Sequence, residues 1–139
     1  MMKENIMMIC LNTISNQSEP THVQLNLTER LPFFIISDCV VDCDYMVQRF
    51  DDYYLLSLKV SGELLIQCQR CLGEFQHHYV NQTELAICRD ERVAEKWMAH
   101  YECIVSGHSE VDLTSIITDE LYLYAPEKHA ELIECTSKM

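Results

Sequence analysis

Apolar and polar residues alternate along most of the segment between residues 38 and 88. Because successive side chains of a strand point to opposite faces of a sheet, this period of two predicts half-buried β-strands. The apolar face of the first strand comprises Cys39, Val41, Cys43, Tyr45 and Val47. The runs 54–60, 64–68 and 75–88 keep the period, so the centre of the chain is predicted to be an antiparallel meander.

Two short segments interrupt this alternation. Ser61-Gly62 is a turn signal, and it allows either a tight hairpin or one long strand with a bulge at Gly62. Cys68 to Gly73 is predicted to be a turn. Before the meander, residues 1–32 are predicted to be irregular to weakly extended, with a short strand at 23–27.

Helical spacing follows the strands. The apolar residues from Val93 to Tyr101 recur at the period of a helix, and Asp90 is the expected N-cap. Asp112 is the expected N-cap of a second helix, which Pro126 ends. We therefore predict an α+β fold, with an antiparallel β-meander or partly closed sheet and two helices in the C-terminal half. Residues 1–139 are expected to form one domain that ends in a tail, 126–139.

Charge limits the class of partner. The chain of 139 residues has a formal net charge of −12. Nonspecific RNA binding depends on Lys and Arg displacing counterions from phosphates, so we expect no direct RNA binding without a partner. A basic protein is the expected partner instead. The apolar run 6–11 lacks the flanks of a secretory signal, because Lys3 is followed by Glu4 and no cleavage site follows. With no membrane span either, we expect a cytoplasmic protein.

The sharpest local motif is Cys68-Gln69-Arg70-Cys71-Leu72-Gly73. Two cysteines separated by two residues supply half of a tetrahedral zinc site when the backbone turns between them. The same spacing also builds a redox dithiol, whose first cysteine normally begins a helix. Here a strand-like run follows Gly73, and this context favours a zinc knuckle over a redox helix.

A zinc site needs two more ligands, and no second Cys-x-x-Cys pair exists. His129 and Cys135 in the tail are candidates, and this pair would attach the C-terminus to the hairpin. His77, His78 and Cys88 are the alternatives nearer in sequence. The plain alternative is a tight turn with two reduced cysteines and no metal, one side chain buried and the other half exposed.

Two blocks of sequence resemble the YceD family, the large ribosomal RNA subunit accumulation proteins. The first is Cys68-Gln69-Arg70-Cys71, preceded by the apolar residues 64–66 and followed by Phe75. The second runs from Glu110 through Asp119-Glu120-Leu121 to Pro126 and His129. The best-matched part is 52–135, and 1–32 matches weakly.

The resemblance implies a bacterial, non-enzymatic factor needed for normal accumulation of large-subunit ribosomal RNA. Its expected partner is a large-subunit ribosomal protein or a pre-ribosomal particle. The family pattern also implies a tail segment with a histidine and a cysteine, matched by His129 and Cys135.

Several residues have both a functional and a plain interpretation. Arg70 either contacts a partner or caps nearby carbonyl groups. Asp119 and Glu120 are placed on the polar, solvated side of the second helix, where they could contact a basic protein. No phosphate-binding loop and no catalytic triad is recognisable, so we predict no catalytic residue. The alternative functions are a dithiol redox protein and a zinc-stabilised binding module, both using Cys68 and Cys71.

Overall fold

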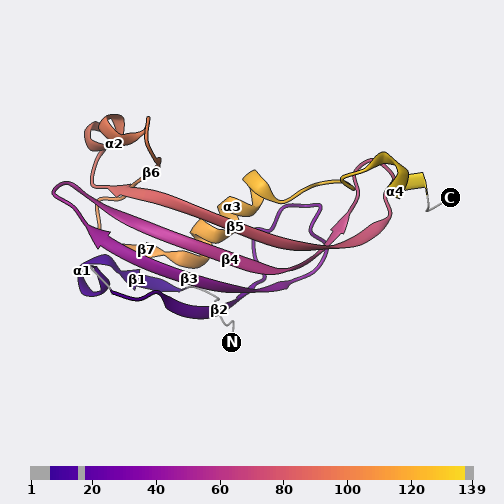
Figure 1. Ribbon diagram of the computed structural model, residues 1–139, viewed down its shortest axis with the longest axis horizontal. Coiled ribbons are helices and arrows are strands. Elements are labelled where there is room, and N and C mark those ends of the chain that lie inside the picture. Colours follow the sequence, from indigo (N-terminus) through magenta and orange to yellow (C-terminus); the bar gives the residue numbers. More distant parts are fainter. Residues whose placement is uncertain (1–6, 16–17, 137–139) are drawn as a thin grey trace.

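The computed structural model describes residues 7–15 and 18–136, and the expectation about Lys3 and Glu4 lies outside them. The fold is mixed α+β, as predicted (Figure 1). In chain order the elements are β1 (Met8–Cys10), α1 (Leu11–Ile14), β2 (Thr21–Leu27), β3 (Cys39–Arg49), β4 (Tyr53–Gln67), β5 (Glu74–Cys88), α2 (Glu91–Trp97), β6 (Glu102–Val105), β7 (Glu110–Asp112), α3 (Leu113–Tyr124) and α4 (Leu132–Thr136).

The main sheet has the strand order β2-β3-β4-β5-β6. The first four strands form the predicted antiparallel meander, while β6 pairs with β5 in parallel. The sheet is open, and β1 and β7 form a separate antiparallel pair. Because β4 and β5 are each 15 residues long, the sheet is a long ribbon with two distant ends.

Gly62 lies inside β4, so of the two alternatives at Ser61-Gly62 the long strand is confirmed and the hairpin is wrong. The register of β4 against β5 runs without interruption from Tyr53 to Gln67, so no bulge is present either. A side chain at this position would collide with β3, because an added Cβ would lie 2.8 Å from the Val40 carbonyl oxygen. Glycine is therefore required here for the close approach of two strands.

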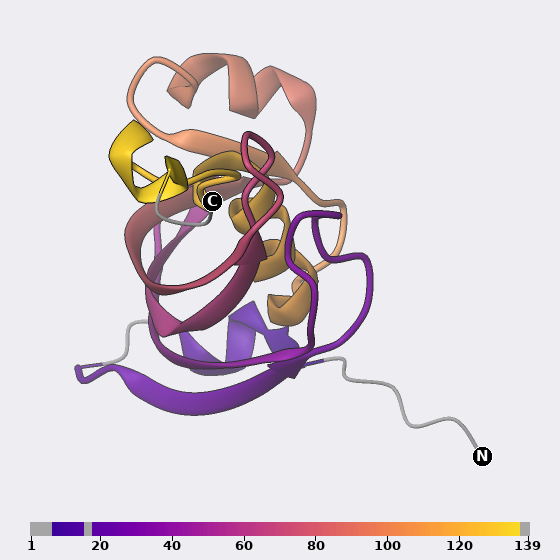
Figure 2. The ribbon, with the colours of Figure 1, turned by 90° about the vertical axis from the view of Figure 1, so that its right-hand side faces the viewer.

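One face of the sheet carries the main core. The alternation predicted for β3 is confirmed, since Cys39, Val41, Cys43, Tyr45 and Val47 are all buried. Viewed from the end, the sheet curls around α3, which lies inside the curve (Figure 2). Ile116, Ile117 and Leu121 of α3 belong to the same core cluster as the strand residues.

On the opposite face, α2 packs on one end of the sheet. Tyr53 and Cys88 join Val93 of α2 in a small second cluster. The Asp90 carboxylate accepts a hydrogen bond from the Val93 N–H at 3.0 Å, which confirms the predicted N-cap. The helix ends at Trp97, before the predicted Tyr101.

Helix α3 also has the predicted cap. The Asp112 carboxylate accepts from the Thr114 N–H at 3.0 Å, and the helix ends at Tyr124, before Pro126. The short elements β1, α1 and α4 were not predicted, because each is too short to show a period. No helix within the described residues is long and apolar enough to cross a bilayer.

Candidate metal centre

The segment Cys68–Gly73, here called the knuckle, joins β4 to β5 as a tight turn. The Cys68 N–H donates to the Gly73 carbonyl at 2.8 Å, and the Leu72 N–H donates to the Cys68 carbonyl at 2.7 Å. Leu72 has a φ of 66°, in the left-handed region. This conformation costs a residue with a Cβ atom about 1–2 kcal/mol. The turn thus brings both thiols to one side, as predicted, in a strand–turn–strand context.

The described part of the tail, residues 126–136, folds back onto the knuckle at the end of the sheet opposite α2 (Figure 1). The Gln69 N–H donates to the Glu127 carbonyl at 2.9 Å. The Arg70 guanidinium donates to the His129 carbonyl at 2.9 Å. These bonds hold His129 against the turn, and α4 then brings Cys135 to the same point, so both residues are buried.

Four candidate ligands therefore meet: Cys68, Cys71, His129 and Cys135, here called the four-ligand cluster. Their ligand atoms all lie within 4.8 Å of one another. The Cys68 and Cys135 sulfurs are 3.7 Å apart, and His129 Nδ1 lies 3.4 Å from the Cys135 sulfur and 3.6 Å from the Cys71 sulfur.

These separations fit a tetrahedral ion. Zinc–sulfur bonds of about 2.3 Å and zinc–nitrogen bonds of about 2.0–2.1 Å give tetrahedron edges of about 3.8 Å between sulfurs and about 3.5 Å between sulfur and nitrogen. The separations of 3.7, 3.4 and 3.6 Å given above lie close to these values. Three sulfurs and one imidazole are also a soft donor set of the kind that selects zinc or iron over magnesium or calcium.

Donors around the cluster favour negatively charged sulfur. The backbone N–H groups of Arg70 and His129 each donate to the Cys68 sulfur at 3.4 Å. The Arg70 Nε–H donates to the Cys135 sulfur at 3.2 Å. Because three thiolates carry one charge more than a divalent ion neutralises, the Arg70 guanidinium offsets the excess.

The surroundings of the two knuckle thiols shift their pKa values in opposite directions. Burial opposes ionisation of Cys68, but the N–H groups of His129, Cys71 and Arg70 outweigh it and lower its pKa to about 5. The Gly73 N–H favours the Cys71 thiolate, yet burial and the neighbouring Cys68 and Cys135 sulfurs raise the pKa of Cys71. Of the two knuckle thiols, Cys68 is thus the one that ionises first, and a bound cation would favour the thiolate of Cys71.

The cluster is enclosed rather than open. Cys68 is fully buried and the ring of Phe75 stacks on the imidazole of His129, with centroids 4.3 Å apart. Phe75 is the second residue of β5, so the strand that follows the thiols also covers the histidine. This arrangement could hold an ion and link the tail to the hairpin.

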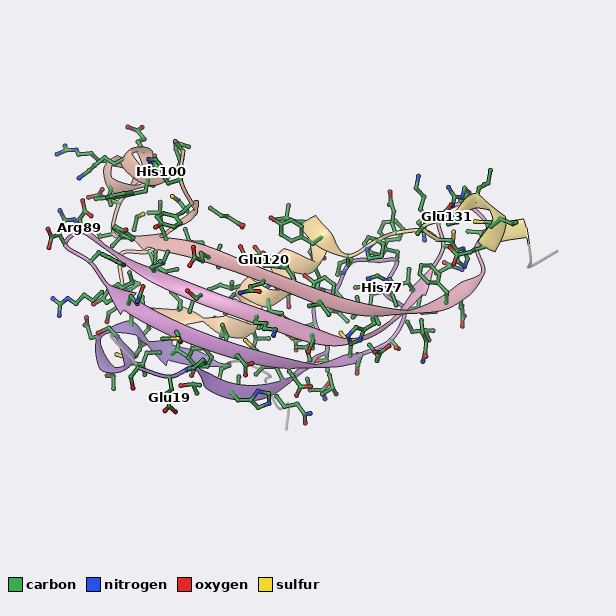
Figure 3. The ribbon with its side chains drawn as sticks, viewed as in Figure 1. Glu19, His77, Arg89, His100, Glu120 and Glu131 are labelled. Carbon is green, nitrogen blue, oxygen red and sulfur yellow. The ribbon has the colours of Figure 1, made fainter. Side chains whose placement is uncertain are left out.

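The nearer alternatives are not part of the cluster. His78 pairs with Glu63 on the exposed face of the sheet, and Cys88 is buried under α2 at the other end. His77 lies on β5 and does not belong to the group of described residues whose ligand atoms lie within 4.8 Å of one another. Figure 3 labels its position on the strand. Of the ligands weighed from the sequence, the structure brings together only the knuckle pair and the tail pair.

The predicted partner residues have different surroundings. Arg70 donates to the His129 carbonyl, which belongs to the tail and not to its own turn. Asp119 is exposed and lies 3.9 Å from Arg30. The placement of Glu120 on a solvated face is wrong, because the residue is only 3% exposed and accepts a hydrogen bond from Asn81 at 3.3 Å. It faces β5 because α3 is packed inside the curve of the sheet (Figure 3).

Comparisons of the chain with protein-family models, curated proteins and solved structures found no match. The resemblance to the YceD family therefore stays a prediction that depends on the residues themselves.

Two features of the site were not predicted from the sequence. They are the stacking of the Phe75 ring on His129 and the left-handed backbone conformation of Leu72. Phe75 had a signal, since it is an aromatic residue two positions after Gly73, where the turn that carries the thiols ends. Leu72 had none, because Gly73 is the residue expected to adopt such a conformation.

Proposed function

We propose that this protein is a zinc-stabilised binding protein that supports accumulation of large-subunit ribosomal RNA through contacts with a protein partner. The four-ligand cluster carries the proposal, because it brings the ligand atoms of residues 68, 71, 129 and 135 within 4.8 Å of one another. Structural zinc sites use four protein ligands of this kind. The ion would fix the tail on the hairpin and give the molecule one rigid end.

The donor set favours a structural role over a catalytic one. Catalytic zinc keeps one coordination position for water or substrate, whereas four protein ligands fill the tetrahedron. The buried Cys68 and the Phe75 ring over His129 also shield the cluster from substrate. We therefore propose a non-enzymatic protein.

The ribosomal part of the proposal is supported by sequence and charge. The resemblance of the knuckle and of the segment 110–129 to the YceD family is its basis. A net charge of −12 suits a protein that holds a basic ribosomal protein in the cytoplasm and does not grip RNA itself.

A capture experiment tests this function. The tagged protein is incubated with bacterial lysate at about 50 mM and about 400 mM salt, and retained proteins are identified. We expect large-subunit ribosomal proteins to be recovered at low salt and in smaller amounts at high salt. A Cys71→Ser variant tests whether capture of the ribosomal proteins requires an intact four-ligand cluster. Recovery of no ribosomal component at low salt would contradict the proposal.

A dithiol redox protein is the second candidate, and the lowered pKa of Cys68 favours it. Against it, Cys68 is fully buried and does not begin a helix. The alkylation rate of the zinc-free protein against pH, followed by mass spectrometry, separates the two. Reversible oxidation of Cys68 with Cys71 under a glutathione couple would support redox function. Failure of the pair to cycle would exclude it.

A further inference from the structure

Strand β5 has a free edge along most of its length. It pairs with β4 throughout, but β6 pairs only with its last four residues, Leu85–Cys88. No other strand in the described part of the chain pairs with β5. A long unpaired edge is a template for another extended chain, and proteins usually protect such edges.

The hydrogen bonds at the strand ends show which residues face this edge. The Cys88 carbonyl accepts from the Ser106 N–H at 2.8 Å and therefore points away from β4. At the other end, the Gln67 N–H donates to the Phe34 carbonyl, so Gln67 does not bond to Glu74 opposite it. Because bonded and non-bonded pairs alternate along an antiparallel ladder, the even-numbered residues of β5 point outward. Val80 and Gln82 thus present free N–H and C=O groups.

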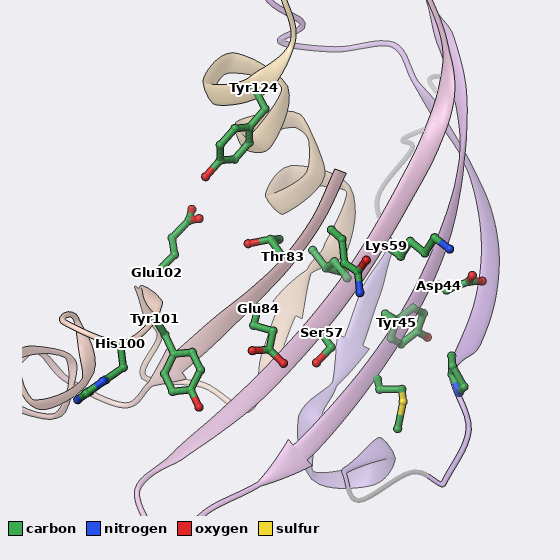
Figure 4. A pocket seen from close by; sticks show the side chains of 14 residues that line it. Asp44, Tyr45, Ser57, Lys59, Thr83, Glu84, His100, Tyr101, Glu102 and Tyr124 are labelled. Atoms are coloured by element: carbon green, nitrogen blue, oxygen red, sulfur yellow. The ribbon is translucent and has the colours of Figure 1, made fainter. Parts of the chain in front are cut away.

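A groove of about 830 Å³ runs across the less buried face of β3, β4 and β5 and reaches this edge at Gln82 and Glu84 (Figure 4). Here it is called the β5 groove, and its walls include Asp44, Lys59, Glu84, Tyr101, Glu102 and Tyr124. Figure 4 shows the hydroxyl of Tyr124, on α3, and the carboxylate of Glu102, on β6, pointing toward one another. Lys59 is the one lysine or arginine among the described residues that line the groove.

The rim of the groove has negative charge without a matching cation. No lysine or arginine of the described chain lies within ion-pair distance of Glu84, Glu102 or Glu120. Burial, together with the neighbouring Glu102 carboxylate, raises the pKa of Glu120 to about 7. On the core face of β5, the hydroxyl of Tyr79 is buried near Glu120 and has no hydrogen-bond partner among the described residues. Carboxylates and tyrosine rings together are the surroundings that favour a lysine or arginine side chain.

We propose that the β5 groove binds an extended, lysine- or arginine-bearing segment of a partner protein, which adds to the free edge of β5 as a strand. The backbone of the segment pairs with Val80 and Gln82, and one cationic side chain enters between Glu102 and Glu120. Backbone pairing supplies affinity in this mode of recognition, and alternate side chains supply specificity. The proposal rests on the proposed function, whose basic protein partner it provides with a binding site.

The test uses a fluorescein-labelled peptide of about nine residues in which lysine and threonine alternate. Binding to the full chain is followed by fluorescence anisotropy at about 50 mM and about 300 mM salt. A peptide with glutamate in place of lysine tests the charge requirement. A lysine peptide N-methylated at alternate positions tests the backbone pairing, because it cannot donate along one edge.

Gln82→Pro removes one outward N–H while leaving the ladder with β4 intact, since proline is tolerated at an edge position. We expect this variant to bind the lysine peptide at least about tenfold more weakly, and Gln82→Ala to bind within about twofold of the wild type. The N-methylated peptide should lose the same affinity on wild-type protein. That measurement keeps the proposal falsifiable even if Gln82→Pro fails to fold.

The double variant Glu84→Gln/Glu102→Gln should also bind at least about tenfold more weakly, with a flatter salt dependence. Glu127→Gln/Glu131→Gln makes the same change in net charge on exposed tail residues at the other end of the sheet, and it should bind like the wild type. Equal losses in the two double variants, or equal binding of the N-methylated peptide, would overturn the proposal.

The lysate capture separates this proposal from the proposed function. Recovery of ribosomal proteins by wild type and Gln82→Pro alike would exclude the groove as their binding site and leave the proposed function standing. Peptide binding with no ribosomal protein captured would support the groove and contradict the ribosomal partner.

Discussion

Arg70 lies between the two knuckle thiols, and its side chain connects them to the tail. It donates to the Cys135 sulfur at 3.2 Å and to the His129 carbonyl at 2.9 Å. A guanidinium can make both bonds at once because its donors form a planar fork. At the scale of single residues, the link between knuckle and tail is thus made by hydrogen bonds as well as by the four-ligand cluster.

Cys135→Ser tests the ligand set at this scale. Loss of one of four ligands weakens ion binding, and the free energy of binding is part of the folding free energy. We expect the melting temperature to fall by at least about 5 °C. The matched control is Cys103→Ser, a half-buried cysteine outside the cluster, because serine can keep its bonds to the Ala94 and Tyr101 carbonyls. Equal effects of the two substitutions would contradict a role for Cys135 as a ligand.

Glu120 predicts a pH dependence of stability. Burial and Glu102 raise the pKa of its carboxyl from 4.5 to about 7 in the folded protein. Since the folded state holds this proton more tightly than the unfolded chain, the stabilisation is complete below about pH 4.5 and is lost as the pH rises to about 7. Asn81 and Tyr79 of β5, Asp119 and Tyr124 of α3, and Glu102 of β6 are the groups around it.

Glu120→Gln should therefore raise the free energy of unfolding at about pH 8 by about 1–3 kcal/mol and change it little at about pH 5. Urea unfolding at both pH values measures the effect, and comparison with wild type at each pH cancels the contribution of the metal ligands. The exposed neighbour Asp119→Asn is the control. A Glu120→Gln variant with the same pH profile as the wild type would show that this carboxyl does not titrate in that range.

Among the elements, β4 shows a conformation that the local sequence pattern could not decide. The alternation on both sides of Gly62 was visible, but Ser61-Gly62 has the composition of a turn. What decides the structure is the approach of β3, whose Val40 carbonyl lies 2.8 Å from where a Cβ would be. That contact depends on the curvature of the sheet, and no local pattern encodes it.

Gly62→Ala tests this contact. The added methyl group must displace backbone of β3, so the free energy of unfolding should fall by about 1–3 kcal/mol in urea unfolding. Gly107→Ala is the matched control, since no atom lies within 4 Å of the position its Cβ would take. Its effect should lie within about 1 kcal/mol and be stabilising. The reverse order of the two variants would contradict the close approach of β3 and β4.

The candidate site, too, could be predicted only in part from local sequence patterns. The Cys-x-x-Cys spacing indicated half of the site, and the structure supplies the other half from a tail more than 50 residues away. Residue spacing alone could not separate His129 and Cys135 from His77, His78 and Cys88, and only the resemblance to the YceD family favoured the tail pair. The outcome depends on how α3 directs the tail back over β5, and this is set by packing inside the curved sheet. Glu120 was misplaced for the same reason.

Across the whole molecule, the two candidate sites lie apart along the ribbon of the sheet. The four-ligand cluster lies at the α4 end, and the groove opens along β5 towards α2 and β6 (Figure 1). Chelation should therefore release the tail and lower the melting temperature, while the sheet that forms the groove persists. Peptide binding before and after chelation checks this. Loss of both together would show that the ion supports the sheet as a whole.

The central claim is that Cys68, Cys71, His129 and Cys135 together hold a metal ion. Native mass spectrometry of protein expressed in bacteria and purified without added zinc tests it directly. We expect about one zinc ion per chain in the wild type and none in Cys71→Ser or Cys135→Ser. A well-folded, metal-free wild-type protein, or a zinc content that these substitutions leave unchanged, would contradict the claim.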